Sequence, residues 1–307
     1  MTNNNEAILV TGSNGMVGYH VVKKLLKLNY KVVGIDPNLY SKKLKNYIHL
    51  SKINLNIDDF LFIFKIYNIV NIVNIVRAGG VSGPMLFNDD PYKVINNNVF
   101  FTIKLVEACR LYKKISRVIY CSSIAAYGNL IIKNTNEDYK FSPNTIYGAS
   151  KASSDLILEN FYNNYDLDII SLRFSVIYGP RRTTNSYIKD MINAAINNQK
   201  LYLPFQSNLC WPYIYIDDVI SAIVKSLFHK KIHSFSYNVT GPDYPTYQSI
   251  YEAIKLFHSN LDVIFSEYNS DTKLELFNIK KIVSDIGWEP TFDIEKGIKK
   301  YIKFFDN

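Results

Sequence analysis

The chain has 307 residues, of which 48% are hydrophobic and 20% charged, a balance that excludes an intrinsically disordered protein and permits a large core. Its formal net charge of +8 comes mostly from lysines spread along the chain, so the charge does not indicate a nucleic-acid partner. No secretory signal pattern and no uninterrupted apolar span are visible, so we expect a cytoplasmic protein that does not enter a membrane.

The first 175 residues alternate between short β-branched runs and amphipathic helical patterns. This alternation predicts a parallel sheet covered by helices on both faces, which is the doubly wound α/β arrangement of a Rossmann fold. The predicted strands are "EAILVTG", "KVVGID", "NIVNIVRAGG", "RVIYCSS" and "DIISLRF", and the predicted helices cover about 15–28, 98–112 and 146–163.

After Gly179-Pro180 the pattern loosens and aromatic residues increase. The segment 213–228 predicts a strand and a helix that return to the main sheet. The last ~70 residues predict a smaller C-terminal α/β lobe over the strand ends, where open α/β sheets bind ligands. We therefore expect a dinucleotide-binding domain from 1–175 plus about 209–235, and a substrate lobe from about 176–208 plus 236–307.

The glycines of "ILVTGSNGMVG" follow the first predicted strand and open the first predicted helix. Gly12 permits a tight turn, Gly15 lets the backbone approach a pyrophosphate, and Gly18 lets helix and strand pack closely. Asp36 ends the next strand, where a carboxylate can bind a ribose 2′-hydroxyl and would repel the extra phosphate of NADP. The sequence therefore predicts dinucleotide binding, with NAD as the cofactor.

Cysteine and histidine spacing gives no metal signature. The three cysteines, Cys109, Cys121 and Cys210, show no paired spacing, and the five histidines form no ligand cluster. We expect free thiols and no metal site.

The stretch "TIYGASK" places Tyr147 and Lys151 four residues apart and hence on one face of a predicted helix. An ammonium beside a phenol lowers the pKa of the phenol, so Tyr147 can remove a hydroxyl proton near neutral pH. Two serines, Ser122 and Ser123, end a predicted strand upstream, and Ser123 can hold the same substrate oxygen. These residues together predict an acid–base site.

Several motifs together resemble the extended short-chain dehydrogenase/reductases, in particular the NAD-dependent sugar epimerases and dehydratases such as UDP-glucose 4-epimerase. The resemblance covers nearly the whole chain. It rests on the glycine loop, on Ser123 four residues before Tyr127-Gly128, on the Tyr147/Lys151 pair, and on "NNVFFT", "LRFSVIYGPRR", "YIYIDDV", "YNVTG" and "IGWEPTFDIEKGI".

The resemblance implies that Tyr147 is the base, that Lys151 lowers its pKa and binds the nicotinamide ribose, and that Ser123 orients the substrate hydroxyl. Hydride then moves from a carbinol carbon to NAD. The expected cofactor contacts are Gly12, Asn14, Gly15, Met16, Val17, Gly18, Asp36, Asn38, Asn54, Leu55, Ala78, Gly79, Gly80, Asn98, Ser122, Tyr147 and Lys151.

The residues after Ser123 narrow the reaction. The sugar 4,6-dehydratases carry an Asp-Glu pair there, and the decarboxylating relatives a Glu, because those reactions need a further acid or base. In this chain the positions hold Ile124 and Ala125, which do neither. The sequence therefore predicts either epimerisation through a transient ketone or net dehydrogenation.

The substrate is less clearly indicated. The aligned position of the arginine that meets a diphosphate in nucleotide-sugar relatives is Trp211, and Val176 stands where those relatives carry Asn. Arg77 replaces the usual His of a His-Leu-Ala-Ala run. The expected substrate contacts are Ser82, Ser123, Tyr178, Arg181 and Trp211.

Three hypotheses follow. A nucleotide-sugar 4-epimerase with an unconventional diphosphate site is favoured by "VIYGPRR", by the paired Asp217-Asp218 and by the C-terminal match. An NAD-dependent dehydrogenase of a small hydroxy compound, similar to the short-chain-type L-threonine dehydrogenases, is the alternative. A non-catalytic NAD-binding regulator is disfavoured by the intact Ser123, Tyr147 and Lys151 set. A homodimer through the helices near 98–112 and 146–163 is expected from the relatives.

Overall fold

Seven parallel strands form the central sheet of the structure, a computed structural model that describes residues 6–38, 44–52, 54–65, 71–83, 86–87, 89–128, 134–267 and 276–305. The strand order is β3-β2-β1-β4-β5-β6-β10, so the order reverses between β1 and β4 as in a Rossmann fold. The strands are β1 (Glu6–Thr11), β2 (Lys31–Ile35), β3 (Tyr47–Leu50), β4 (Asn71–Arg77), β5 (Arg117–Ser123), β6 (Ile169–Phe174) and β10 (Ser236–Val239).

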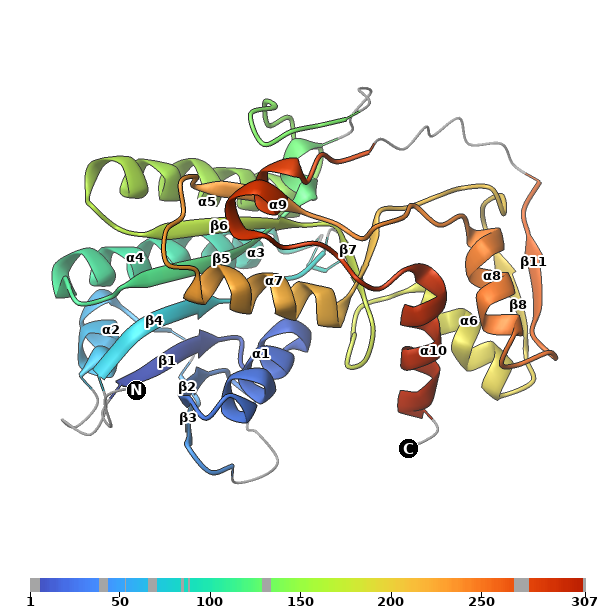
Figure 1. The fold of residues 1–307 in the computed structure, drawn as a ribbon, viewed down its shortest axis with the longest axis horizontal. Coiled ribbons are helices and arrows are strands. Elements are labelled where there is room, and N and C mark those ends of the chain that lie inside the picture. The colour runs from blue at the N-terminus through green and yellow to red at the C-terminus, as the bar shows by residue number, and fades with distance from the viewer. Residues whose placement is uncertain are drawn as a thin grey trace.

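Helices cover both faces of this sheet (Figure 1). A cluster of buried hydrophobic side chains lies on each face of the sheet. One cluster contains Val21 and Val22 of the first helix, and the other contains Leu105 and Val106 of a helix on the opposite face. The predicted doubly wound α/β fold is confirmed. On one face lie α1 (Met16–Lys27) and α7 (Ile216–Phe228), and on the other α2 (Ile57–Phe64), α3 (Pro91–Ile95), α4 (Phe101–Tyr112) and α5 (Ile146–Asn164).

A smaller lobe follows β6 and lies at the right of the view in Figure 1. It contains two short parallel strand pairs, β7 with β9 and β8 with β11. No helix among the described residues is long and apolar enough to cross a bilayer. The remaining elements are β7 (Val176–Tyr178), β8 (Lys200–Leu203), β9 (Tyr213–Tyr215), β11 (Asp262–Phe265), α6 (Tyr187–Ile196), α8 (Tyr247–Lys255), α9 (Lys280–Ile286) and α10 (Ile294–Phe305).

The expected boundaries of the lobe differ from the structure at two strands. The strand beginning at Tyr213 does not return to the main sheet, because β9 pairs with β7 and its rings pack in an aromatic cluster with Tyr178 and Phe292. The seventh strand of the main sheet is instead β10, whose Ser236 lies opposite Ser171 of β6. All four residues of β10 are buried, which fits the main sheet rather than a peripheral lobe.

The cysteines are free within the described residues, with Cys109 and Cys121 buried as expected and Cys210 half-exposed. Burial raises the pKa of the Cys121 thiol to about 12. The thiol is therefore protonated at neutral pH and is not a nucleophile.

Candidate active site

A cavity of about 980 Å³ lies over the carboxyl ends of the central strands. Its wall contains the loop after β1, the end of β2, the loop after β4, the end of β5, the start of α5 and the segment after β7. Parallel strands bring their carboxyl ends to one edge, and the reversal of strand order opens a crevice there. The volume lies at the upper limit of ordinary small-molecule pockets, about 1,000 Å³.

The glycine loop forms one end of the cavity. Gly12 has φ +65° and its amide donates to the Ile35 carbonyl at 2.7 Å, which turns the chain sharply after β1. Gly15 is the N-cap of α1 and provides no side-chain cap, so the first amides of the helix face the cavity without a competing side chain. Asn14, Met16 and Val17 also line this end.

Gly18 lies behind the loop rather than in the cavity lining. A Cβ at this position would lie 2.0 Å from the Gly12 carbonyl oxygen, a backbone atom that cannot move aside. We expect Gly18→Ala to displace the loop and to weaken NAD binding at least about tenfold, or ~1.4 kcal/mol, in equilibrium titrations. The control is Gly287→Ala at the end of α9, outside the cavity lining, where a Cβ meets nothing within 4 Å and the φ of +65° strains the local backbone only. Equal NAD affinity in both variants would contradict the role assigned to the loop.

Asp36 follows β2 and is 6% exposed. Its carboxylate accepts hydrogen bonds from the Asn14 amide at 3.0 Å and from the Asn38 amide at 2.9 Å, and all three residues line the cavity. The carboxylate is thereby held in the position expected for a ribose contact. Two other expected cofactor contacts lie elsewhere: Asn54 is exposed outside the lining, and Leu55 is buried in the core under α2.

The loop after β4 contributes Ala78, Gly79 and Gly80 to the lining. Asn98 was expected to contact the cofactor, but it supports this loop instead. Its Oδ1 accepts from the Val81 amide at 2.8 Å and its amide group donates to the Val81 carbonyl at 3.2 Å. Asn98 lies in a π-helical turn, η2 (Asn96–Phe100), between α3 and α4, which turns its side chain toward the loop.

Ser123, Tyr147 and Lys151 come together at the other end of the cavity. Ser123 ends β5, and its Oγ accepts from the Ala125 amide at 3.2 Å. Tyr147 lies in the first turn of α5, which Thr145 caps by accepting from the Gly148 amide at 3.0 Å. Ser123 and Tyr147 line the cavity and their hydroxyls interact. Lys151, one turn further along α5, is 7% exposed and lies just behind the lining.

The electrostatics of this group differ from the expectation that Lys151 lowers the pKa of Tyr147. Burial raises the pKa of Tyr147 above its ordinary value, against the opposing effect of the hydrogen bond with Ser123. The Lys151 ammonium donates to the Cys121 carbonyl at 2.7 Å and lies 5.9 Å from the centre of the Tyr147 ring. Burial lowers the pKa of Lys151 to about 8, and the cation of Arg77 acts in the same direction.

The surroundings of Ser123 offer no further proton donor or acceptor of carboxylate type. Ile124 and Ala125 both line the cavity. Asp36, at the glycine-loop end, is the one acidic residue among the described residues that line it. The buried Oγ of Ser122 also faces this cavity and meets no hydrogen-bond partner within the described residues. Such an orphaned hydroxyl is typical of a ligand-binding wall.

The expected substrate contacts divide into two groups. Ser82 and Trp211 line the cavity, with Gly83 beside Ser82, whereas Pro84 and Met85 of the same segment lie outside the described residues. Tyr178 is buried in the lobe, where its ring packs on Tyr213 and Tyr215. Its hydroxyl lies against α10, because a Cβ on Gly297 would come 1.7 Å from it.

Arg181 was also expected at the substrate, but it lies outside the cavity lining, whereas the neighbouring Arg182 is part of it. Arg181 has φ +67° and points back to the glycine loop, where its guanidinium donates to Asn14 Oδ1 at 3.0 Å and lies 3.9 Å from the Tyr19 ring centre. Arg182 lines the cavity with Thr183 and Thr184, and burial lowers its pKa. The tandem arginines could be noticed in the sequence, but which of them faces the cavity depends on this backbone conformation.

The described residues fit a dinucleotide. A glycine turn and the open amides of α1 suit a pyrophosphate, the oriented carboxylate of Asp36 suits a ribose, and the Ser122 hydroxyl, without a partner among the described residues, belongs to a residue of the same lining. Other lining residues were not predicted as contacts, although some of them belong to motifs quoted above: Thr11, Lys52, Asn144, Thr145, Phe174, Ser175, Arg182, Thr183, Thr184 and Phe277.

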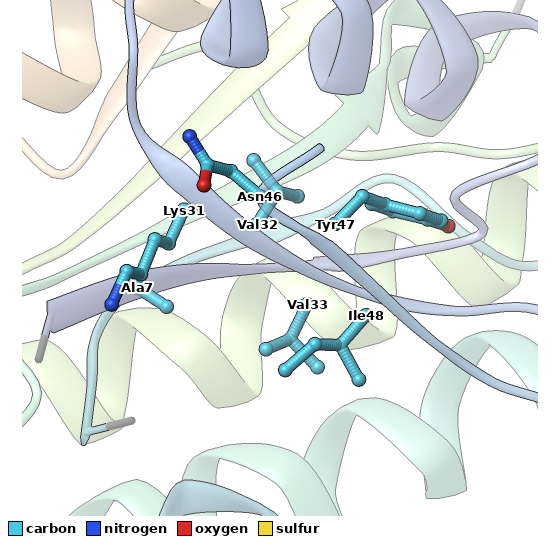
Figure 2. A pocket seen from close by; sticks show the side chains of 7 residues that line it. All are labelled: Ala7, Lys31, Val32, Val33, Asn46, Tyr47 and Ile48. Carbon is cyan, nitrogen blue, oxygen red and sulfur yellow. The ribbon is translucent and has the colours of Figure 1, made fainter. Parts of the chain in front are cut away.

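A second cavity, of about 210 Å³, lies at the β1-β2-β3 edge of the sheet. Figure 2 shows Val33 and Ile48 side by side below these strands and Asn46 and Tyr47 above them. Its seven lining residues include no acid and no thiol. The chemistry of the site therefore belongs to the larger cavity.

Comparison with known proteins agrees with this geometry. Residues 8–240 match the model of the NAD dependent epimerase/dehydratase family. Protein CapI of Staphylococcus aureus is 26% identical over 97% of this chain and 98% of its own length. UDP-N-acetylglucosamine 4-epimerase from Methanobrevibacter ruminantium, solved with UDP-N-acetylmuramic acid, superposes with a TM-score of 0.85 at 26% identity over 99% of each chain. UDP-glucuronic acid 4-epimerase from Bacillus cereus, solved with UDP-glucuronic acid and NAD, shares the fold at 22% identity, with a TM-score of 0.84 over 98% of this chain and 99% of that one.

Proposed function

The chain belongs to the NAD-dependent epimerase/dehydratase family, and we propose that it catalyses the 4-epimerisation of a nucleotide sugar through a transient 4-keto intermediate. The relatives that match nearly the whole of this chain include UDP-glucuronate 4-epimerase 1 of Arabidopsis thaliana and UDP-N-acetylglucosamine 4-epimerase of Methanobrevibacter ruminantium. A UDP-sugar is therefore the first substrate class to test.

The observation that carries this proposal is that the described lining beside Ser123 and Tyr147 contains no carboxylate. The lining next to Ser123 consists of Ile124 and Ala125, and the described carboxylate of the cavity, Asp36, belongs to the cofactor end. Eliminating water needs an acid and a base positioned at two different carbons. Oxidation and re-reduction at one carbon needs a single proton acceptor, which Tyr147 supplies.

In this proposal each residue of the site has its own role in the reaction. Bound NAD supplies the acceptor and later the donor of the hydride. Tyr147 takes the proton of the substrate hydroxyl as the carbon is oxidised, and returns it when the ketone is reduced from its opposite face. Ser123 holds the same oxygen from the end of β5. Lys151, fixed to the Cys121 carbonyl, keeps a positive charge below the reacting group.

Arg182, Thr183 and Thr184 support a substrate with an anionic group at the lobe side of the cavity. The Arg182 guanidinium is held by Thr184 Oγ1 at 3.1 Å and by the Asn185 carbonyl at 3.2 Å, and it has no carboxylate partner in the described part of the chain. An arginine in this setting suits a carboxylate or phosphate oxygen.

Trp211 favours a second candidate function, the NAD-dependent dehydrogenation of a small hydroxy compound. This side chain lines the cavity where an arginine would meet a diphosphate, and Val176, Pro212 and Phe277 make the same wall apolar. An apolar wall suits an uncharged part of a substrate better than the diphosphate of a nucleotide.

One assay separates the two functions. The purified protein is incubated with UDP-, GDP- and dTDP-sugars, including UDP-glucuronate, and separately with NAD and a panel of small hydroxy acids and amino acids. We expect interconversion of two UDP-sugars, detected by chromatography, with no net rise in absorbance at 340 nm. Stoichiometric NADH from a small hydroxy compound, with no sugar turnover, would replace the epimerase by the dehydrogenase.

We also infer a homodimer formed through α4 and α5. Leu111 of α4 and Leu156 of α5 are about half exposed although both helices pack on the sheet through their other faces. Apolar side chains of two neighbouring helices on one surface suit a two-fold helical interface.

A further inference from the structure

Arg77 is a buried cation without an anionic partner. It ends β4 and is 3% exposed. Its guanidinium donates to Thr102 Oγ1 at 3.2 Å, to Thr11 Oγ1 at 3.4 Å and to the Asn97 carbonyl at 2.6 Å, which are neutral acceptors. Within the described residues it forms no ion pair, whereas two other buried arginines of the sheet do: Arg117 is paired with Asp168 at 2.7 Å and Arg173 with Asp155 at 2.8 Å.

The charge of Arg77 is permanent at neutral pH and reaches the cavity. Burial lowers its pKa to about 10, so the guanidinium stays protonated. Arg77 is part of the lining together with Gly79 and Gly80 of the loop that follows it, and neither glycine has a side chain that could cover the guanidinium. A Cβ on Gly79 would lie 2.8 Å from Arg77 Nη1. The loop is therefore shaped around the guanidinium.

Arg77 borders both ends of the cavity, because it lies opposite Thr11 of β1 and opposite Tyr120 of β5, the strand that ends at Ser123. It is one of the groups that lower the pKa of Lys151, and Tyr120 lies beside both cations, with the Lys151 ammonium 4.9 Å from its ring centre. Hydride has to leave the carbon whose hydroxyl Tyr147 deprotonates. The nicotinamide ring is therefore required at the end of the cavity that holds Tyr147 and Lys151 and that Arg77 borders.

We propose that Arg77 makes this site bind NADH in preference to NAD, because its unpaired charge disfavours the positive charge of the oxidised nicotinamide ring. NAD and NADH differ by one unit of charge on that ring, and a fixed cation in a poorly hydrated site favours the neutral form. The inference rests on the NAD-binding part of the proposed function and not on the identity of the sugar. Its consequence is that the reduced cofactor, and with it the oxidised substrate, is retained during the reaction.

The test is a competition that uses the full-length protein and no sugar. Protein is equilibrated with NAD and NADH at known ratios, unbound nucleotide is removed, and bound NAD and NADH are extracted and quantified. We expect the preference of the wild-type protein for NADH to fall at least about fivefold in Arg77→Met. Arg77→Lys keeps the charge, so its preference for NADH over NAD should stay within about twofold of the wild-type value. The control Arg110→Met removes the same charge from the surface of α4, where Arg110 is paired with Glu107, and should leave the ratio unchanged.

Two results would overturn the inference. The first is an Arg77→Met variant that binds NADH and NAD in the wild-type ratio. The second is an equal loss of the NADH preference in Arg77→Lys and Arg77→Met, which would mean that the shape of the side chain matters and its charge does not. Folding is checked by circular dichroism. If Arg77→Met does not fold, Arg77→His at pH 8 takes its place, because an imidazole with an ordinary pKa of about 6.5 is neutral there. A protein without activity on sugars would still give a result in this competition, so the two proposals fail separately.

Discussion

Tyr147→Phe is expected to lower turnover roughly 10³-fold while NAD still binds within about twofold of the wild-type affinity. Among the described residues of the lining, the Tyr147 phenol is the proposed proton acceptor, and its hydroxyl interacts with that of Ser123. The substitution removes this oxygen and leaves the aromatic ring and the cap of α5 by Thr145 intact. Turnover is measured under saturating sugar, and NAD affinity by titration.

The matched control for this variant is Tyr165→Phe. Tyr165 follows the same helix at its C-cap and is half-exposed, away from the cavity. Removal of the Tyr165 hydroxyl should leave turnover within about twofold of the wild-type value. Full activity in Tyr147→Phe would remove Tyr147 as the base, and equal losses in both variants would indicate damage to α5 rather than to the chemistry.

Asp155→Ala is expected to lower the free energy of unfolding by about 3–5 kcal/mol. Asp155 is fully buried on α5 and accepts from Arg173 Nε at 2.8 Å and from Ser171 Oγ at 2.6 Å. Its removal leaves the Arg173 guanidinium buried without an anion, although Arg173 still donates to Tyr127 and to the Glu137 carbonyl. Because α5 carries Tyr147 and Lys151, this contact fixes the catalytic helix to β6.

Urea denaturation at equilibrium measures this free energy, and Glu159→Ala is the control. Glu159 lies one turn further along α5 and is exposed, so its removal should change stability by no more than about 0.5 kcal/mol. If the free energies of unfolding of the two variants differ by less than about 1 kcal/mol, the buried Asp155–Arg173 pair does not anchor α5.

The sheet and the glycine loop were predictable because their signals are local. Short apolar runs and glycine spacing are set by neighbouring residues, and the structure has a strand at each of the five predicted strands of the first 175 residues. β10 was misassigned to the lobe because a strand of four residues carries no mark of which sheet it joins. Its partner, β6, lies more than 60 residues earlier in the chain, so only the tertiary structure pairs them.

The direction of individual side chains was the harder part. Asn98 was expected at the cofactor and is turned to Val81 by a π-helical turn that no spacing rule predicts. Arg181 and Arg182 are adjacent, and the positive φ of Arg181 decides which of them reaches the cavity. The pKa of Tyr147 depends on burial, which a four-residue spacing to Lys151 does not report.

In the proposed reaction one carbon of a nucleotide sugar is oxidised and then reduced again within the same site. Incubation with UDP-sugars carrying deuterium at C4, beginning with UDP-glucuronate and UDP-glucose, tests this reaction when the products are analysed by mass spectrometry and NMR. We expect a 4-epimer that retains deuterium at C4 and takes up none from deuterated solvent. Loss of the label into free NADH, or a product that gains solvent deuterium at C4, would contradict the proposed reaction.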